Sequence, residues 1–200
     1  MNSFKLKIDA FCICKSEFYQ TFSSISDTLT HEFSKGINTF NCEIDDKYFA
    51  ISYLLSRYGR TKKGMIVYET PEVYIDGKSS TLEELGEKCC YIDSKYFEFS
   101  HRKSTRKLVE KGLSKSGIKM SADEIRDKFM ITDFRFERNP GYTGNERFKA
   151  MAAVAYAFGK DVFCFPWFSR TRFDGFHRNL SDLMEILESL GKIVILPLGR

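Results

Sequence analysis

The sequence predicts a mixed α/β domain in which a small antiparallel subdomain precedes a layer of parallel strands. At the start of the chain, apolar and polar side chains alternate over residues 4–14, which is typical of a half-buried strand. In the second half, apolar strands alternate with helices, and this alternation favours parallel strands. Between the halves lies a polar, basic stretch that is predicted to be helical. We therefore expect one domain over residues 1–200, with a helical insert at 94–138.

The composition is that of a globular chain. The sequence carries 31 Lys and Arg against 27 Asp and Glu, and the net charge of +4 is too small for a dedicated nucleic-acid binder. The longest apolar stretch, residues 150–158, is far shorter than the roughly 20 residues of a membrane-spanning helix. The first residues contain no apolar h-region of a secretory signal peptide, so we expect a cytoplasmic protein, either free or bound peripherally at the inner face of the membrane. Six cysteines without a Cys-x-x-Cys pair predict free thiols and no metal site.

The first half of the chain is predicted to consist of short strands and two helices. After the first strand, further strands are expected at residues 28–33, 37–40, 65–68, 72–75 and 89–92. The Asp45-Asp46 pair is expected to cap a helix that continues to Tyr58. A hairpin turn is expected at residues 76–78, and Thr81 begins a capping box for a short helix.

The second half is predicted to alternate regularly. A break at Asn139-Pro140-Gly141 precedes it. Helices are expected at residues 144–158 and 178–190, and buried strands at 162–167 and 193–196. Gly191 supplies the C-terminal stop of the second helix.

The segment Tyr142-Thr143-Gly144-Asn145-Glu146 precedes a helix of small, apolar residues and a buried strand. It resembles the Leu-Ser-Gly-Gly-Gln/Glu signature of the ATP-binding cassette (ABC) ATPases, matching at Gly144 and Glu146 and approximately at Thr143. The order of elements along nearly the whole chain is also similar to the family's nucleotide-binding domain. The resemblance implies a signature-like half-site that covers phosphates held by a second domain. Its residues are Thr143, Gly144, Asn145 and Glu146.

The segment in the place of the family's phosphate-binding loop departs from the pattern. Such a loop works because glycines expose successive backbone N–H groups to the phosphates. The corresponding residues include no glycine and three carboxylates: Asn41, Cys42, Glu43, Asp45 and Asp46. Each carboxylate near a triphosphate costs on the order of 1 kcal/mol even when partly screened, so we do not expect ATP to bind here in the family's manner. A second Gly-x4-Gly spacing at 59–64 is followed by Met65-Ile66, where Lys and Ser or Thr are required.

The catalytic parts of the family are also missing. Residues 162–169 contain no Asp or Glu where the family has its Walker B acids. Residues 196–200, in the place of the switch histidine, contain no histidine. The resemblance therefore implies a degenerate domain with no catalytic residue and no cofactor of its own, to which ATP binds only in trans with a partner. Tyr19 and Phe22 match the family's base-stacking aromatic by position alone, which leaves open an altered mode of nucleotide binding.

The resemblance also implies partners. A non-catalytic subunit of this family pairs with an active ABC ATPase or with a second copy of itself, under a membrane permease. Candidate interface residues are Tyr96, Phe97, Phe99, Trp167 and Phe168. Large aromatic side chains of this kind fill a core as readily as they cover an interface, and both interpretations remain open.

Two functions of other classes remain as alternatives. A stand-alone binding or regulatory protein would contact nucleic acid or an anionic surface through residues 102–119, where Lys107, Lys111, Lys115 and Lys119 recur at four-residue steps. A metal-dependent nuclease would use some of the acidic residues Asp123, Glu124, Asp127, Asp133 and Glu137 as metal ligands. The nuclease ranks last, because acidic residues near a helix start serve equally well as caps.

Overall fold

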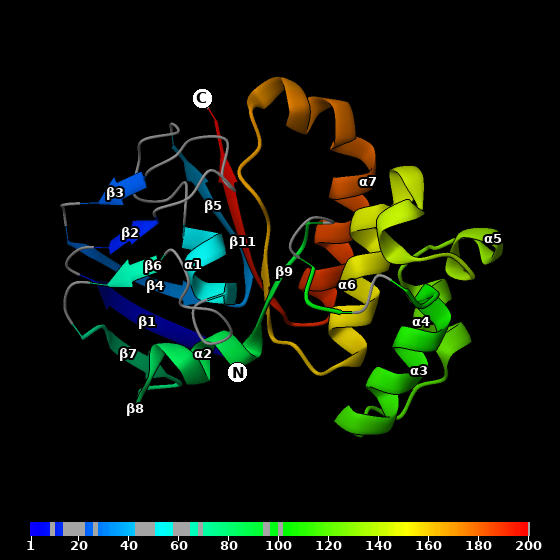
Figure 1. Ribbon diagram of the computed structural model, residues 1–200, viewed down its shortest axis with the longest axis horizontal. Helices are drawn as coiled ribbons and strands as arrows, with labels where there is room; N and C mark the ends of the chain where they lie inside the picture. Colours follow the sequence, from blue (N-terminus) through cyan, green and yellow to red (C-terminus); the bar gives the residue numbers. More distant parts are fainter. Residues whose placement is uncertain are drawn as a thin grey trace.

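The computed structural model describes residues 1–8, 11–13, 23–25, 28–42, 51–57, 65–67, 70–93, 97–99 and 102–199. Within them, antiparallel strands with two helices lie on one side of a parallel sheet, and the other helices lie on its opposite side (Figure 1). The antiparallel strands with α1 and α2 thus form one layer, the parallel sheet lies in the middle, and the remaining helices form the layer on its other side. The predicted mixed α/β fold with an antiparallel subdomain is confirmed.

The four-stranded antiparallel sheet has the order β4-β1-β7-β8. Its strands are β1 (Ser3–Ile8), β4 (Leu29–Ser34), β7 (Glu72–Ile75) and β8 (Lys78–Ser80). In β1, Phe4, Leu6 and Ile8 are buried, as the period of two predicts. The predicted hairpin turn joins β7 to β8, with Asp76 at φ 48° and Gly77 at φ 78°.

The single strand predicted over residues 4–14 is wrong in its extent. The structure has two strands in different sheets, β1 and then β2 (Phe11–Ile13). β2 lies at the centre of a three-stranded sheet between β3 (Ser23–Ile25) and β6 (Met65–Val67). Sequence alternation does not reveal this change of partner, because both strands have the same period.

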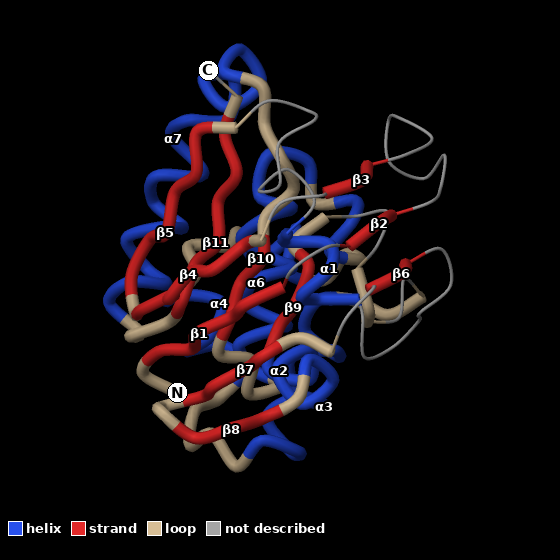
Figure 2. The backbone as a smooth tube through the Cα atoms, turned by 90° about the vertical axis from the view of Figure 1, so that its left-hand side faces the viewer, coloured by secondary structure: helices blue, strands red, loops and turns tan. Residues whose placement is uncertain are grey.

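The parallel sheet has the order β5-β11-β10-β9, and every pair in it is parallel. Its strands are β5 (Gly36–Asn41), β9 (Cys89–Tyr91), β10 (Val162–Cys164) and β11 (Ile193–Leu198). β9, β10 and β11 are buried at every position, as expected for strands covered on both faces. Figure 2 shows the antiparallel strands in front of this sheet and the helices α6 and α7 behind it.

Nine helical segments connect and cover the described strands. They are α1 (Ile51–Arg57), α2 (Leu82–Lys88), α3 (Thr105–Ser116), α4 (Ala122–Lys128), α5 (Asp133–Phe136), the 3₁₀ helices η1 (Pro140–Tyr142) and η2 (Gly144–Glu146), α6 (Arg147–Ala157) and α7 (Arg170–Ser189). The capping box at Thr81 is confirmed, because its hydroxyl accepts from the Glu84 N–H while the Glu84 carboxylate accepts from the Thr81 N–H. Among the helices that the structure describes, none combines the length and apolar character that a membrane crossing requires.

Two predicted features of the helices need correction. The last helix begins at Arg170 rather than Arg178, because Ser169 caps its N-terminus by accepting from the Arg172 N–H. The predicted lysine stripe is shorter than expected. α3 ends at Ser116, where Gly117 adopts φ 73°, and Lys119 therefore lies beyond the helix.

Two hydrophobic clusters lie on either side of the parallel sheet. One joins alternate side chains of β10 and β11, such as Phe163 and Val194, to the helices α3, α6 and α7. The other joins Val162 and Ile195 to α1, α2 and the antiparallel sheet. The parallel sheet is thus the shared centre of the core, and its carboxyl edge is held by elements from both halves of the chain.

Candidate functional site

The carboxyl edge of the parallel sheet is the first place to look for a site, because ligands of open α/β sheets bind outside the carboxyl ends of the strands. Since all four strands run in the same direction, the residues that follow them meet at one edge. Cys42 follows β5, Gly199 follows β11, Trp167 follows β10 and Asp93 follows β9. The segments named from the sequence as the phosphate-loop and Walker B positions therefore converge here.

Trp167 lies across this edge, between the ends of β5 and β11. Its indole Nε1 donates a hydrogen bond of 2.9 Å to the carbonyl oxygen of Cys42, two strands away in the sheet. A Cβ atom at Gly199 would lie 2.8 Å from Cζ2 of Trp167, so the ring packs directly on the backbone at the end of β11. The Gly199 N–H also donates to the Phe168 carbonyl oxygen at 2.8 Å, which fixes the segment that carries the ring. The indole thereby bridges the ends of β10 and β5 across β11.

The phosphate-loop position is only partly described. Asn41 is exposed at the end of β5 and Cys42 is buried, whereas Glu43, Asp45 and Asp46 lie outside the described residues. The sequence interpretation missed Asp93, a half-buried carboxylate directly after β9. Its position immediately behind an apolar strand was the signal that could have identified it.

The described thiols near this sheet are buried in the core. Cys42, Cys89, Cys90 and Cys164 are free and buried. Burial raises the pKa of the Cys164 thiol, and the neighbouring Cys89 raises it further. A thiol held in its neutral form is a poor nucleophile. Among the described residues no group of three or more His, Cys, Asp and Glu side chains is placed to hold a metal ion.

The signature-like turn presents only part of its side chains to solvent. Thr143 is 1% exposed, and its hydroxyl donates a 2.8 Å hydrogen bond to the Pro140 carbonyl oxygen. Gly144 and Asn145 are exposed, and Gly144 has φ 60°, a conformation that favours glycine. The exposed part of this turn, residues 142–146, thus consists of Gly144, the Asn145 amide and the ring of Tyr142, which is 76% exposed, just before α6.

Glu146 is bound to the helical insert. It is 8% exposed, and its Oε2 accepts from the Thr132 backbone N–H at 3.0 Å and from the Thr132 hydroxyl at 3.3 Å. Its Oε1 pairs with Arg135 Nη1 at 2.8 Å. Because a buried carboxylate is stable only when it is paired, Glu146 has a structural role in joining α6 to α5. The four predicted half-site residues therefore divide into two that are exposed and two that hold the turn.

The candidate interface aromatics are mostly in the core. Phe168 is completely buried, with its ring 5.7 Å from that of Phe148 and perpendicular to it, so its assignment to an interface is wrong. Phe97 is 6% exposed and likewise belongs to the core. Phe99 is half-buried and stacks on Phe158 at 4.2 Å. Trp167 is half-buried at the sheet edge, and Tyr96 lies outside the described residues.

Four of the five acidic residues considered for a nuclease pair with arginines, and the fifth, Glu124, accepts from the Ser121 N–H in the capping box of α4. Asp123 pairs with Arg106 at 3.0 Å and with Arg126 at 3.1 Å, and Arg126 also pairs with Asp127 and Asp133 at 2.7 Å each. Arg106 lowers the pKa of the Asp123 carboxyl by its hydrogen bond and its charge. These carboxylates are thus balanced by cations, which a metal site would have to displace.

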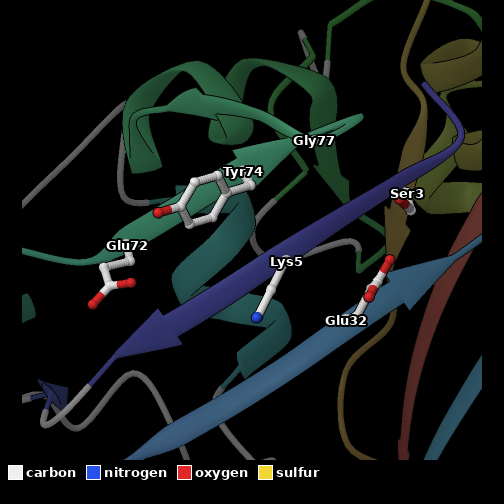
Figure 3. A pocket seen from close by; sticks show the side chains of 6 residues that line it. All are labelled: Ser3, Lys5, Glu32, Glu72, Tyr74 and Gly77. Carbon is white, nitrogen blue, oxygen red and sulfur yellow. The ribbon is translucent and has the colours of Figure 1, made fainter.

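The solvent-facing side of the antiparallel sheet has a surface cavity of about 310 Å³ (Figure 3). Its lining residues are Ser3, Lys5, Glu32, Glu72, Tyr74 and Gly77. Lys5 lies opposite Glu32 on β4, and Glu72 is bound to Lys7 at 2.7 Å. With two carboxylates and one lysine in its lining, the cavity does not favour a phosphate-bearing ligand.

No protein-family model and no curated protein matches the sequence, but its fold matches solved structures. A putative ABC transporter ATP-binding protein from Pyrococcus furiosus is 13% identical, with a TM-score of 0.60 over 99% of this chain and 90% of that chain. The cbiO1 protein from Clostridium perfringens, part of the ABC transporter complex cbiONQ, is 13% identical, with a TM-score of 0.58 over 98% of this chain and 78% of that chain. A bacterial Atm1-family ABC exporter with ATP bound is 12% identical, with a TM-score of 0.60 over 100% of this chain and 34% of that chain. The chain therefore has the fold of these ATP-binding proteins.

Proposed function

From this fold we propose that the chain is a non-catalytic ABC ATPase-like subunit that pairs with an active ATPase, with a membrane permease, or with both. The observation that best supports this proposal is the position of Trp167, whose indole bridges the ends of β10 and β5. In this fold class a ligand enters at that edge, and hydrolysis of a bound nucleotide needs carboxylates and a metal ion there. An indole packed on Gly199 supplies neither charge nor a metal ligand.

The signature-like turn supports a role in trans. Gly144 and Asn145 are exposed immediately before α6, and the start of a helix offers free N–H groups and the positive end of its dipole. The contacts of Thr143 and Glu146 hold this turn in place without using its exposed side. ATP would therefore bind only between this turn and a partner that supplies its own phosphate-binding loop.

The expectation that the chain has no ATP site of its own is tested with its single tryptophan. Because Trp167 lies at the edge where nucleotide would enter, its fluorescence reports binding directly. We expect no saturable change on titration with ATP and Mg²⁺ up to about 1 mM, no calorimetric heat of binding and no phosphate release. Saturable binding with Mg²⁺-dependent turnover would refute the proposal, and the Trp167→Phe variant identifies any signal that does not come from this residue.

The pairing is tested by purification from the native cell with crosslinking. We expect an ABC ATPase or permease subunit in the complex, with crosslinks to residues 142–146. In the isolated complex, Asn145→Asp adds a negative charge where the partner's phosphates would lie, and we expect ATP turnover to fall at least tenfold. Ser114→Asp, at an exposed position of α3, is the matched control and should leave turnover unchanged. A chain that forms no such complex would contradict this function.

A second candidate function rests on α3. Lys107, Lys111 and Lys115 are exposed on this helix, which suits contact with nucleic acid or an anionic membrane surface. A stand-alone binding protein of this kind would bind DNA, RNA or anionic vesicles with an affinity that falls steeply with salt. Binding that is absent or independent of salt would exclude it.

A further inference from the structure

We propose that the surface cavity on the antiparallel sheet binds a small zwitterion, namely an α-amino acid with an aromatic side chain. The cavity is lined by β1, β4 and the β7–β8 hairpin. The function proposed above concerns other elements, the parallel sheet and the signature-like turn, so binding in this cavity does not depend on that function. Three features of the cavity select the ligand: the row of side chains that lines it, their lack of partners within the chain, and its size and charge.

Three polar side chains stand in one row across the sheet. Lys5 on β1 lies opposite Glu32 on β4 and opposite Tyr74 on β7. Directly opposite residues of antiparallel strands share a face, with Cβ atoms about 4.5–5.5 Å apart. Because Phe4 and Leu6, on either side of Lys5, are buried in the core, this row faces solvent. Figure 3 shows Lys5 between Tyr74 and Glu32. The sheet thus presents a phenol, an ammonium group and a carboxylate side by side.

These three groups are not used within the part of the chain that the structure describes. There, the side chains of Lys5, Glu32 and Tyr74 make no hydrogen bond and no ion pair. The adjacent row differs, because Lys7 Nζ lies 2.7 Å from Glu72 Oε1 and neutralises that carboxylate. The ammonium group of Lys5 and the carboxylate of Glu32 therefore remain available to a ligand, one on each of two neighbouring strands.

The cavity is built on a rigid frame. The Asp76 carboxylate Oδ1 accepts hydrogen bonds from the backbone N–H groups of Asn2 at 2.7 Å and Ser3 at 3.0 Å, which holds the β7–β8 turn against the start of β1. A Cβ atom at Gly77, in that turn, would meet no other atom within 4 Å, so the cavity is open at this end. A ligand thus enters between groups that are already held in place, and little ordering of the protein opposes binding.

Size and charge select the ligand. The volume of about 310 Å³ is at the lower end of the range of small-molecule sites, about 300–1,000 Å³. Glu32 suits an ammonium group and Lys5 suits a carboxylate, each through a charge-assisted hydrogen bond. The ring of Tyr74 is 38% exposed and offers its surface to an aromatic side chain. A ligand with net negative charge would be repelled by Glu32, whereas a zwitterion pairs both charges. An aromatic α-amino acid combines all three groups.

The test is calorimetric titration of the full chain with L-phenylalanine. We expect saturable binding of one molecule per chain with a Kd below about 1 mM. Phenylpropionate, which lacks the ammonium group, and phenethylamine, which lacks the carboxylate, should each bind at least about tenfold more weakly. In two-dimensional NMR spectra, L-phenylalanine should shift the amide signals of Lys5, Glu32 and Tyr74.

Substitutions assign the two charges of the ligand to their partners. Glu32→Gln and Lys5→Met each remove one charge from the cavity, and each should weaken the binding of L-phenylalanine at least about tenfold. Glu110→Gln and Lys111→Met are the matched controls, because both residues are exposed on α3, and they should leave the affinity unchanged. Circular dichroism of all four variants establishes that they fold.

Four outcomes would overturn the proposal. The first is no saturable heat with L-phenylalanine up to about 10 mM. The second is equal affinity for either analogue that lacks one charge. The third is an equal loss of affinity in the cavity variants and in their controls on α3. The fourth is a set of NMR shifts confined to residues outside the cavity.

Discussion

The ion pair between Lys149 on α6 and Asp182 on α7 allows a sharp test of how the helical layer is held together. Lys149 Nζ lies 2.7 Å from Asp182 Oδ2. The two side chains differ in their surroundings, because that of Lys149 is 5% exposed and that of Asp182 is 34% exposed. Removing one partner should therefore not have the same effect as removing the other.

The expected magnitudes follow from this asymmetry. Asp182→Ala leaves the ammonium group buried without a counter-charge; breaking a fully buried pair costs about 3–5 kcal/mol, and the partial exposure of Asp182 reduces this to about 2–3 kcal/mol. Lys149→Met keeps an unbranched apolar side chain in the core and leaves Asp182 in contact with water, so the loss should be under about 1 kcal/mol. For a chain of this length, we expect Asp182→Ala to lower the melting temperature by about 4–12 °C and Lys149→Met to lower it by under about 4 °C.

Equilibrium unfolding in urea, followed by Trp167 fluorescence and by circular dichroism, measures both losses. The double variant Lys149→Met, Asp182→Ala should be more stable than Asp182→Ala alone, since it contains no unpaired buried charge. Equal losses in the two single variants, or a larger loss in Lys149→Met, would show that the pair is effectively at the surface.

Three further changes test other parts of the fold. Gly112→Ala should destabilise the protein by about 1–3 kcal/mol in urea despite the helix preference for alanine, because the new Cβ would lie 2.8 Å from the Ala157 carbonyl carbon; an unchanged midpoint would contradict this. The Asp76 carboxylate accepts hydrogen bonds from the backbone N–H groups of Ser3 and Asn2, and these bonds lower its pKa. The ionised carboxylate therefore stabilises the folded protein at neutral pH, and this contribution is lost as the pH falls below about 3.8. Asp76→Asn should therefore flatten the acid side of a plot of melting temperature against pH. Thr81→Ala should cost about 1 kcal/mol in thermal unfolding, with Thr81→Ser as the control that retains the cap.

Local signals in the sequence were sufficient for most elements. The alternation in β1, the capping box at Thr81 and the apolar strand β10 were predicted in place, because period, caps and turns depend on neighbouring residues. The start of α7 was missed because its first two turns are rich in arginine and carry few apolar residues. The structure shows that the helix begins there, because the Arg172 N–H donates to the Ser169 hydroxyl and the Phe173 N–H donates to the Ser169 carbonyl oxygen.

The candidate site was predicted less completely than the fold. The sequence identified the signature-like turn and the segment after β10, but it could not show that Phe168 is fully buried while its neighbour Trp167 reaches Cys42. Nor could it show that the Thr143 hydroxyl and the Glu146 carboxylate are bonded within the chain. Side-chain direction at such positions depends on which distant segment packs against them.

The sequence by itself determined the fold class, the absence of acidic residues at positions 162–169 and the uncharged character of β5. These are properties of residue type and spacing, which short stretches of chain specify on their own. The tertiary structure alone decided that the ends of β5 and β10 are bridged by Trp167 and that Phe168 beside it is fully buried against Phe148. Each of these depends on contacts between residues far apart in the chain, and those contacts exist only after both layers have packed on the parallel sheet.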